Sequence, residues 1–94
     1  MIYADNAATT KLSGAAISAM LDCMEETWGN PSSLYGLGQQ AKEALERARE
    51  RLAACIGASP REITFTSGGS EADNQAIRSA ALLGAHKGKR HIIS

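Results

Sequence analysis

The sequence is poor in large side chains and in cysteine, and each shortage excludes a class of protein. Four of the 94 residues are aromatic, and 17 are alanines, which bring little more than a methyl group to a core. Two cysteines cannot build a disulfide scaffold, and neither belongs to a Cys-x-x-Cys or Cys/His cluster of the kind that binds zinc. We therefore expect no metal site and a reducing environment.

The sequence also has no excess of positive or negative charge. Ten Lys and Arg residues balance ten Asp and Glu residues, so bulk charge gives no reason to expect a nucleic-acid partner. The first residues have neither the basic nor the apolar segment of a secretory signal. No apolar run approaches the ~18–20 residues of a membrane span. These absences predict a cytoplasmic protein with no membrane partner.

The length of the chain limits its core. On folding, a domain this short buries only ~60–65% of the surface that its unfolded chain exposes. Because so many of the apolar residues are alanines, methyl groups would make up much of the buried surface. We therefore expect the chain to complete its core against further polypeptide.

Two amphipathic helices are predicted in the first sixty residues. Ser13 can cap a helix that runs to about Thr27. Apolar residues recur in it at the spacing of one helix face, namely Ile17, Met20, Leu21 and Met24. A second helix is expected over residues 37–56, where Gly57 supplies a left-handed stop and Pro60 prevents continuation.

The rest of the chain alternates between strand and helix signals. Residues 62–66 are rich in β-branched and aromatic side chains and predict a strand. A helix is expected over 71–83, and a second strand begins at 91–93. This order is typical of an α/β fold whose parallel strands need cover on both faces. The predicted fold class is thus α/β, mainly helical here, with the first strands of a sheet.

The junction between that strand and helix carries the best chemical signal. In Ser67-Gly68-Gly69-Ser70, glycines let backbone N–H groups approach an oxyanion, and the helix start directs free amides and a partial positive charge at it. The Ser70 hydroxyl adds a donor, although the spacing is not that of a Walker loop. An alternative stays open, in which Ser70 only caps the helix and Asp73 completes a capping box.

No side chain of the sequence qualifies as a catalytic group. Glu71 and Asp73 fall on different faces of a helix, which disfavours paired-carboxylate chemistry. Cys23 and Cys55 lie on helices and are interpreted as packing residues. None of the four lysines lies in an apolar segment of the kind that activates an amine for covalent catalysis (Lys11, Lys42, Lys87 and Lys89). We therefore predict no catalytic residue in this chain.

Three blocks, at residues 3–10, 29–33 and 65–74, together resemble the N-terminal blocks of cysteine desulfurases. These enzymes belong to the class V aminotransferases, which have the fold-type I pyridoxal-phosphate architecture. The resemblance therefore implies that the predicted strands are the first of a mixed, mostly parallel sheet. The resemblance covers essentially the whole chain, in order and with the expected separations. It departs from the common pattern at Tyr35, where relatives often carry His, and at Ser70, where Thr is more usual.

The resemblance implies an activity, a cofactor and site residues. Cysteine desulfurases use pyridoxal 5'-phosphate to take sulfur from L-cysteine, leaving L-alanine and an enzyme persulfide for iron–sulfur cluster assembly or thiolation pathways. In relatives, the loop matching Gly69 and Ser70 binds the cofactor phosphate. The block matching Asn6 and Ala7 lies near the substrate. The complete enzyme is expected to be a homodimer that delivers sulfur to an acceptor protein.

The resemblance also implies a division of the chain. Residues 1–34 are expected to pack with the small domain, and residues 35–94 to begin the large cofactor-binding domain. The family's catalytic residues all match positions beyond 94. We therefore expect this fragment to be inactive without the remaining C-terminal part, in the same or a second chain. Two alternatives are a non-catalytic module that pairs with a full-length desulfurase, and a sibling activity such as selenocysteine lyase or aminotransferase.

Overall fold

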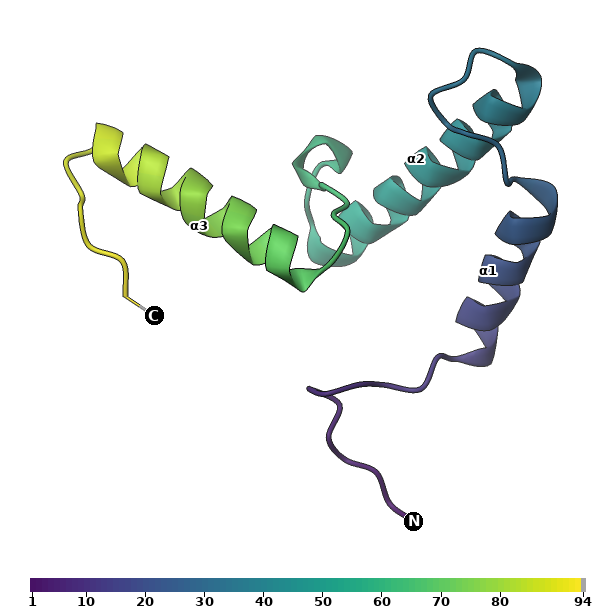
Figure 1. The fold of residues 1–94 in the computed structure, drawn as a ribbon, viewed down its shortest axis with the longest axis horizontal. Coiled ribbons are helices and arrows are strands. Elements are labelled where there is room, and N and C mark those ends of the chain that lie inside the picture. The colour runs from purple at the N-terminus through teal and green to yellow at the C-terminus, as the bar shows by residue number, and fades with distance from the viewer. Residues whose placement is uncertain (94) are drawn as a thin grey trace. The chain divides into compact units, whose positions relative to one another are not determined.

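The computed structural model describes residues 1–93, and these are mainly helical. The elements follow in the order α1 (Gly14–Glu26), α2 (Gly36–Ile56), the short 3-10 helix η1 (Pro60–Glu62) and α3 (Gly69–His86) (Figure 1). The chain divides into two compact units, Met1–Glu62 and Ile63–Ser94. Each unit is described by itself.

Helix α1 begins and ends where the sequence predicts. The Ser13 hydroxyl oxygen accepts a hydrogen bond from the Ala16 N–H at 3.1 Å, which satisfies one of the free donors of the first turn. A serine in this position stabilises a helix by about 1 kcal/mol relative to alanine. At the other end, Thr27 donates to the Cys23 carbonyl from both its N–H, at 3.1 Å, and its hydroxyl, at 3.2 Å.

Helix α2 ends on a glycine, as its sequence indicates. Gly57 has φ +67°, a left-handed conformation that glycine adopts without a steric penalty. The Gly57 N–H donates to the Ala54 carbonyl at 3.4 Å, and the Ala58 N–H donates to the Ala53 carbonyl at 2.9 Å. This pair of bonds is the Schellman motif. The predicted stop at Gly57 is therefore confirmed.

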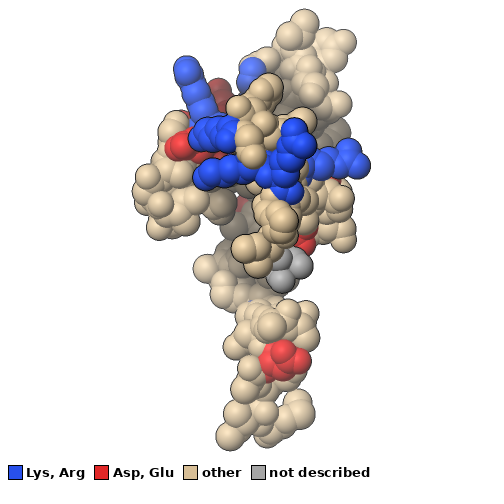
Figure 2. Space-filling view, turned by 90° about the vertical axis from the view of Figure 1, so that its left-hand side faces the viewer, with Lys and Arg blue, Asp and Glu red and all other residues tan. Residues whose placement is uncertain are grey.

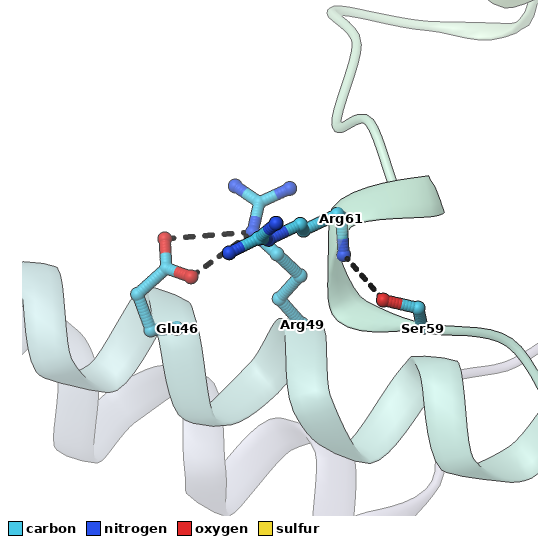
Figure 3. A network of polar contacts seen from close by, with 4 residues as sticks. All are labelled: Glu46, Arg49, Ser59 and Arg61. Atoms are coloured by element: carbon cyan, nitrogen blue, oxygen red, sulfur yellow. Dashed lines mark hydrogen bonds and ion pairs between the residues drawn. The ribbon is translucent and has the colours of Figure 1, made fainter.

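Polar contacts link neighbouring residues within α2 and within the short segment that follows it. Within α2, the Glu46 carboxylate accepts from the Arg49 Nε at 3.3 Å (Figure 3). In η1, the Ser59 N–H donates to the Glu62 carboxylate at 2.7 Å, and the Arg61 N–H donates to the Ser59 hydroxyl at 3.4 Å. This reciprocal arrangement is a capping box. It explains why Glu62, predicted to begin a strand, belongs to a helical turn instead.

Small residues allow the closest packing in the first unit. A Cβ added to Gly29 would lie 2.5 Å from the Leu37 carbonyl oxygen, and one added to Gly38 would lie 2.7 Å from the Asn30 carbonyl oxygen. The segment 29–33 therefore lies directly against the first turn of α2. The contact leaves no room for a side chain at either glycine.

The apolar faces of the helices are mostly uncovered. Among the described residues, the buried apolar side chains are Ala41 and Ala53, both in α2. The predicted apolar stripe of α1 is present but exposed, with Ile17, at 43%, its least exposed member. Large exposed apolar patches are rare on soluble monomers and are typical of surfaces that contact another molecule.

Neither predicted strand forms in the described part of the chain. Residues 63–66 and 91–93 have irregular conformations. A β-strand is stabilised by hydrogen bonds to a neighbouring strand, and parallel strands also need cover on both faces. Two short segments and one helix between them, α3, do not provide that cover. The helices of the predicted α/β fold are therefore observed, while its sheet is not confirmed.

Helix α3 is longer than predicted and ends in a second Schellman motif. Gly88, at φ +69°, donates its N–H to the Ala85 carbonyl at 3.0 Å, and the Lys89 N–H donates to the Gly84 carbonyl at 2.8 Å. The basic residues of this turn are exposed, and Figure 2 views the molecule from the end at which α3 terminates. Cations there complement the negative end of the helix dipole.

A substitution at Gly38 tests the close contact in the first unit. We expect Gly38→Ala to destabilise the unit by about 1–3 kcal/mol, because the new methyl group overlaps the Asn30 and Ser33 backbone. The measurement is thermal unfolding followed by circular dichroism. Gly36→Ala is the control, since a Cβ at Gly36 meets nothing within 4 Å. Equal stabilities of the two variants would show that the contact is absent.

Candidate anion-binding site

The loop before α3 is held by a small network of hydrogen bonds in the second unit. The Thr66 hydroxyl donates to the Gly68 carbonyl at 3.1 Å, and the Ala72 N–H donates to the same carbonyl at 3.1 Å as the first bond of the helix. Glu71 Oε2 accepts from the Ser67 N–H at 2.8 Å and from the Ser67 hydroxyl at 2.5 Å. The network fixes the backbone on both sides of Gly68.

The first turn of α3 presents donors that suit an anion. The N–H groups of Gly69, Ser70 and Glu71 precede the first intrahelical bond and have no acceptor within the helix. Space beside Gly68 and Gly69 is open, because an added Cβ would meet nothing within 4 Å at either position. Backbone amides, a serine hydroxyl and the positive end of a helix dipole form a donor set that fits a phosphate group.

The alternative in which Ser70 caps the helix is wrong. Gly68 is the N-cap residue, and Ser70 lies inside the first turn, where its carbonyl accepts from the Asn74 side-chain amide at 2.8 Å. The carboxylate that reaches back over the helix start belongs to Glu71, not to Asp73. Gly68 has no side chain with which to cap, and Glu71 accepts from Ser67, the residue before the N-cap, and not from the N-cap N–H as the acid of a capping box does.

The hydrogen bonds from Ser67 lower the pKa of Glu71. The Ser67 hydroxyl has the largest effect and the Ser67 N–H the next, while a small desolvation effect opposes them. Both donors stabilise the ionised carboxylate. From the sequence, Glu71 was considered only as a member of a carboxylate pair, although an acid three residues after a helix N-cap is a recognisable signal.

The two predicted substrate residues share a turn in the first unit. Asp5 organises this turn, since its carbonyl accepts from the Ala8 N–H at 3.2 Å. The Asn6 side-chain oxygen accepts from the Thr10 hydroxyl at 3.3 Å, and Asn6 is exposed. Ala7 is exposed in the same turn. Asn6 and Ala7 thus lie together, as do Gly69 and Ser70, with one pair in each unit.

The described residues contain neither a cluster of side chains that could bind a metal nor a helix that could span a membrane. In the described residues, no cluster of three His, Cys, Asp or Glu side chains could hold a metal ion. Over the same residues, none of the helices combines the length and the apolar character that crossing a membrane requires.

Comparison with known proteins places the chain in a family. A model of the family described as aminotransferase class-V matches residues 2–94, and the chain belongs to this family. It is 47% identical over 94 residues to a cysteine desulfurase of Trichormus azollae, an alignment that covers 100% of this chain and 23% of the relative.

Other relatives carry two related names. Cysteine desulfurase IscS of Methanosarcina thermophila is 47% identical over 93 residues, 99% of this chain and 23% of the relative. Selenocysteine lyase of Bos taurus is 50% identical over 78 residues, 83% of this chain and 18% of the relative. The chain therefore spans about a quarter of the length of the cysteine desulfurases that it matches. No solved structure matches it.

The carboxylate of Glu71 gives a prediction with a defined sign. Its pKa is lowered in the folded chain from a usual 4.5, so its bonds to Ser67 stabilise the start of α3 above pH 4.5. That stability is lost as the pH falls through the lowered pKa. We expect Glu71 to titrate below 4.5 in an NMR pH titration, and nearer to 4.5 in Ser67→Ala.

Asp73→Asn is the control for this titration. It removes another acid of the same helix without touching the bonds between Glu71 and Ser67. The lowered pKa of Glu71 should therefore remain in that variant. A wild-type Glu71 that titrates at 4.5 or above would contradict the observed geometry.

Proposed function

We propose that this chain is the part of a pyridoxal-phosphate-dependent cysteine desulfurase that holds the phosphate end of the cofactor. The observation that carries the proposal is the donor set at Gly69 and Ser70, which lies within a family match over residues 2–94. The names of the relatives, cysteine desulfurase among them, support the same assignment. The fold-type I architecture of the complete enzyme follows from the family.

The chain's own residues would hold and orient the bound molecules. The N–H groups of Gly69 and Ser70 and the Ser70 hydroxyl would bind the phosphate. The free NH2 group of Asn6 would donate to a polar group of the substrate, and the small side chain of Ala7 would leave room for it. When bound, pyridoxal phosphate supplies an electron sink, which is the chemistry that protein side chains lack.

The reaction would need polypeptide outside this chain. The complete enzyme would convert L-cysteine to L-alanine and pass the sulfur, as an enzyme persulfide, to an acceptor protein for iron–sulfur cluster assembly or thiolation. We propose that it acts in the cytoplasm as a homodimer. The four lysines are all exposed and none lies in an apolar site that would activate it (Lys11, Lys42, Lys87 and Lys89). The isolated chain is therefore proposed to be inactive.

The uncovered apolar stripe of α1 supports a division of the chain. Residues 1–34 would pack against the small domain of the complete enzyme, which would cover Met20, Leu21 and Met24. Residues 35–94 would begin the large domain, where the remaining strands would complete the sheet with residues 63–66 and 91–93.

A second candidate function is that of a selenocysteine lyase. Two relatives with this name, from Bos taurus and Homo sapiens, are 50% identical to this chain over 78 residues. The two reactions differ only in the chalcogen of the substrate side chain, selenium in place of sulfur. The phosphate-binding residues would act identically in both, so the choice rests on residues outside this chain.

Ser70 provides a direct test of the phosphate site. We expect Ser70→Ala to weaken the binding of pyridoxal 5'-phosphate by roughly ten- to hundredfold, because one hydrogen bond to a charged group is lost. Binding is measured by titration of the cofactor's absorbance and fluorescence. Ser79→Ala, on the same helix but about two and a half turns further on, is the control and should bind as wild type does. Equal affinities for all three chains would contradict the proposal.

The lysines provide a second test. After incubation with pyridoxal 5'-phosphate and reduction with borohydride, we expect mass spectrometry to find only scattered, substoichiometric modification. The physical reason is that exposed amines are protonated and carry no groups that fix the aldehyde beside them. Stoichiometric modification of a single lysine would show that the chain alone contains a covalent cofactor site.

A further inference from the structure

The Glu71 carboxylate is the one charged group in the hydrogen-bond network of residues 66–72. It accepts two hydrogen bonds, and both come from Ser67. Gly68 follows directly, in an extended conformation with φ 167° and ψ 177°. A glycine has many accessible conformations, so a single one persists only when its neighbours are held. Ser67 is held by Glu71, and the Gly68 carbonyl is held by Thr66 and Ala72.

An acid at the start of a helix could act on a phosphate site in two opposite ways. It could compete with the phosphate for the free N–H groups, or it could fix the loop that presents them. The two roles use different donors. Glu71 takes the donors of Ser67, whereas the N–H groups of Gly69 and Ser70 lie one and two residues past the N-cap Gly68. The observed bonds therefore leave the anion donors free.

We propose that Glu71 is a positioning residue for the phosphate site. By holding Ser67, it fixes the loop that enters Gly68, while Thr66 and Ala72 hold the Gly68 carbonyl, so that the N–H groups of Gly69 and Ser70 point toward one bound phosphate. This inference rests on the proposed function, since it assigns Glu71 a part in that same site. Glu71 acts through Ser67 and does not itself contact the phosphate.

The charges around Glu71 do not change this assignment. Arg78 lines the same shallow surface depression on α3 as Ser70 and Glu71, together with Asn74 and Gln75. Asp73 is the other acid of the first two turns. All of these side chains are exposed, so water and salt screen the charge of each on a phosphate. The two short hydrogen bonds to Ser67 are the specific interaction.

The experiment compares three variants of the full chain. Inorganic phosphate is titrated at pH 7, and the NMR shifts of the Gly69 and Ser70 amides give the affinity. We expect Glu71→Ala to weaken binding by about fivefold, as the loss of a hydrogen bond of ordinary strength would. Glu71→Gln keeps an acceptor oxygen and should recover part of the affinity. Asp73→Ala removes the same charge but no bond to Ser67, and it should bind at least as tightly as wild type.

Hydrogen exchange gives a readout that needs no ligand. The Ser67 amide proton should exchange faster in Glu71→Ala than in wild type, and at the wild-type rate in Asp73→Ala. Circular dichroism of each variant reports whether α3 is intact. Glu71→Gln keeps the test decisive if the alanine variant loses the helix.

The outcomes separate this inference from the proposed function. If wild-type Gly69 and Ser70 do not respond to phosphate, the proposed function fails, and the positioning role fails with it. If they respond equally or more strongly in Glu71→Ala, only the positioning role is overturned, because Glu71 then competes with phosphate or merely caps the helix. Weaker binding in Glu71→Ala, with Asp73→Ala unaffected, supports the inference.

Discussion

The candidate site depends on one interaction, the pair of hydrogen bonds that the Glu71 carboxylate accepts from Ser67. A helix start without a capping side chain leaves its first N–H groups free, and Gly68 has no side chain to supply. Glu71 secures the loop from inside the helix and leaves the amides of Gly69 and Ser70 available. The same absence of a side chain at Gly68 and Gly69 keeps the approach to those amides open. The bonds between Glu71 and Ser67 thus stabilise the helix start, while the amides of Gly69 and Ser70 stay accessible to an anion.

The first unit follows a different constraint, since it packs through its smallest residues. Gly29 and Gly38 allow segment 29–33 to lie on α2, and the buried apolar residues of the described chain are alanines. Alanine burial removes little apolar area from water, so it contributes little stability. The larger apolar side chains of α1 remain exposed. The chain spans about a quarter of the length of its cysteine desulfurase relatives, and its exposed apolar faces are available for contact with another molecule.

Features decided by neighbouring residues could be predicted from the sequence. Ser13 and Gly57 were both identified as helix ends, because capping depends on a few adjacent residues. The strands at 62–66 and 91–93 were not observed, because a strand depends on partners that the described residues do not include. The helix α3 was correctly predicted, but its start was placed two residues late.

The candidate site was predicted only in part, for a related reason. Gly69 and Ser70 were recognisable because glycine and serine before a helix suit an anion, whatever holds the loop. The part played by Glu71 depends on which residue is the N-cap, and Gly68 gives no side-chain signal. The assignments of Asn6 and Ala7 to the substrate came from family resemblance and remain predictions.

The central claim is that this chain holds the phosphate end of the cofactor in a cysteine desulfurase, and that the catalytic residues lie in further polypeptide. The most direct measurement mixes the chain with the complementary C-terminal three quarters of a cysteine desulfurase relative, in the presence of pyridoxal 5'-phosphate, and follows L-alanine formed from L-cysteine. The account predicts that alanine forms only when both pieces are present and that Ser70→Ala slows it. Alanine formation that is the same with and without this chain would contradict the account.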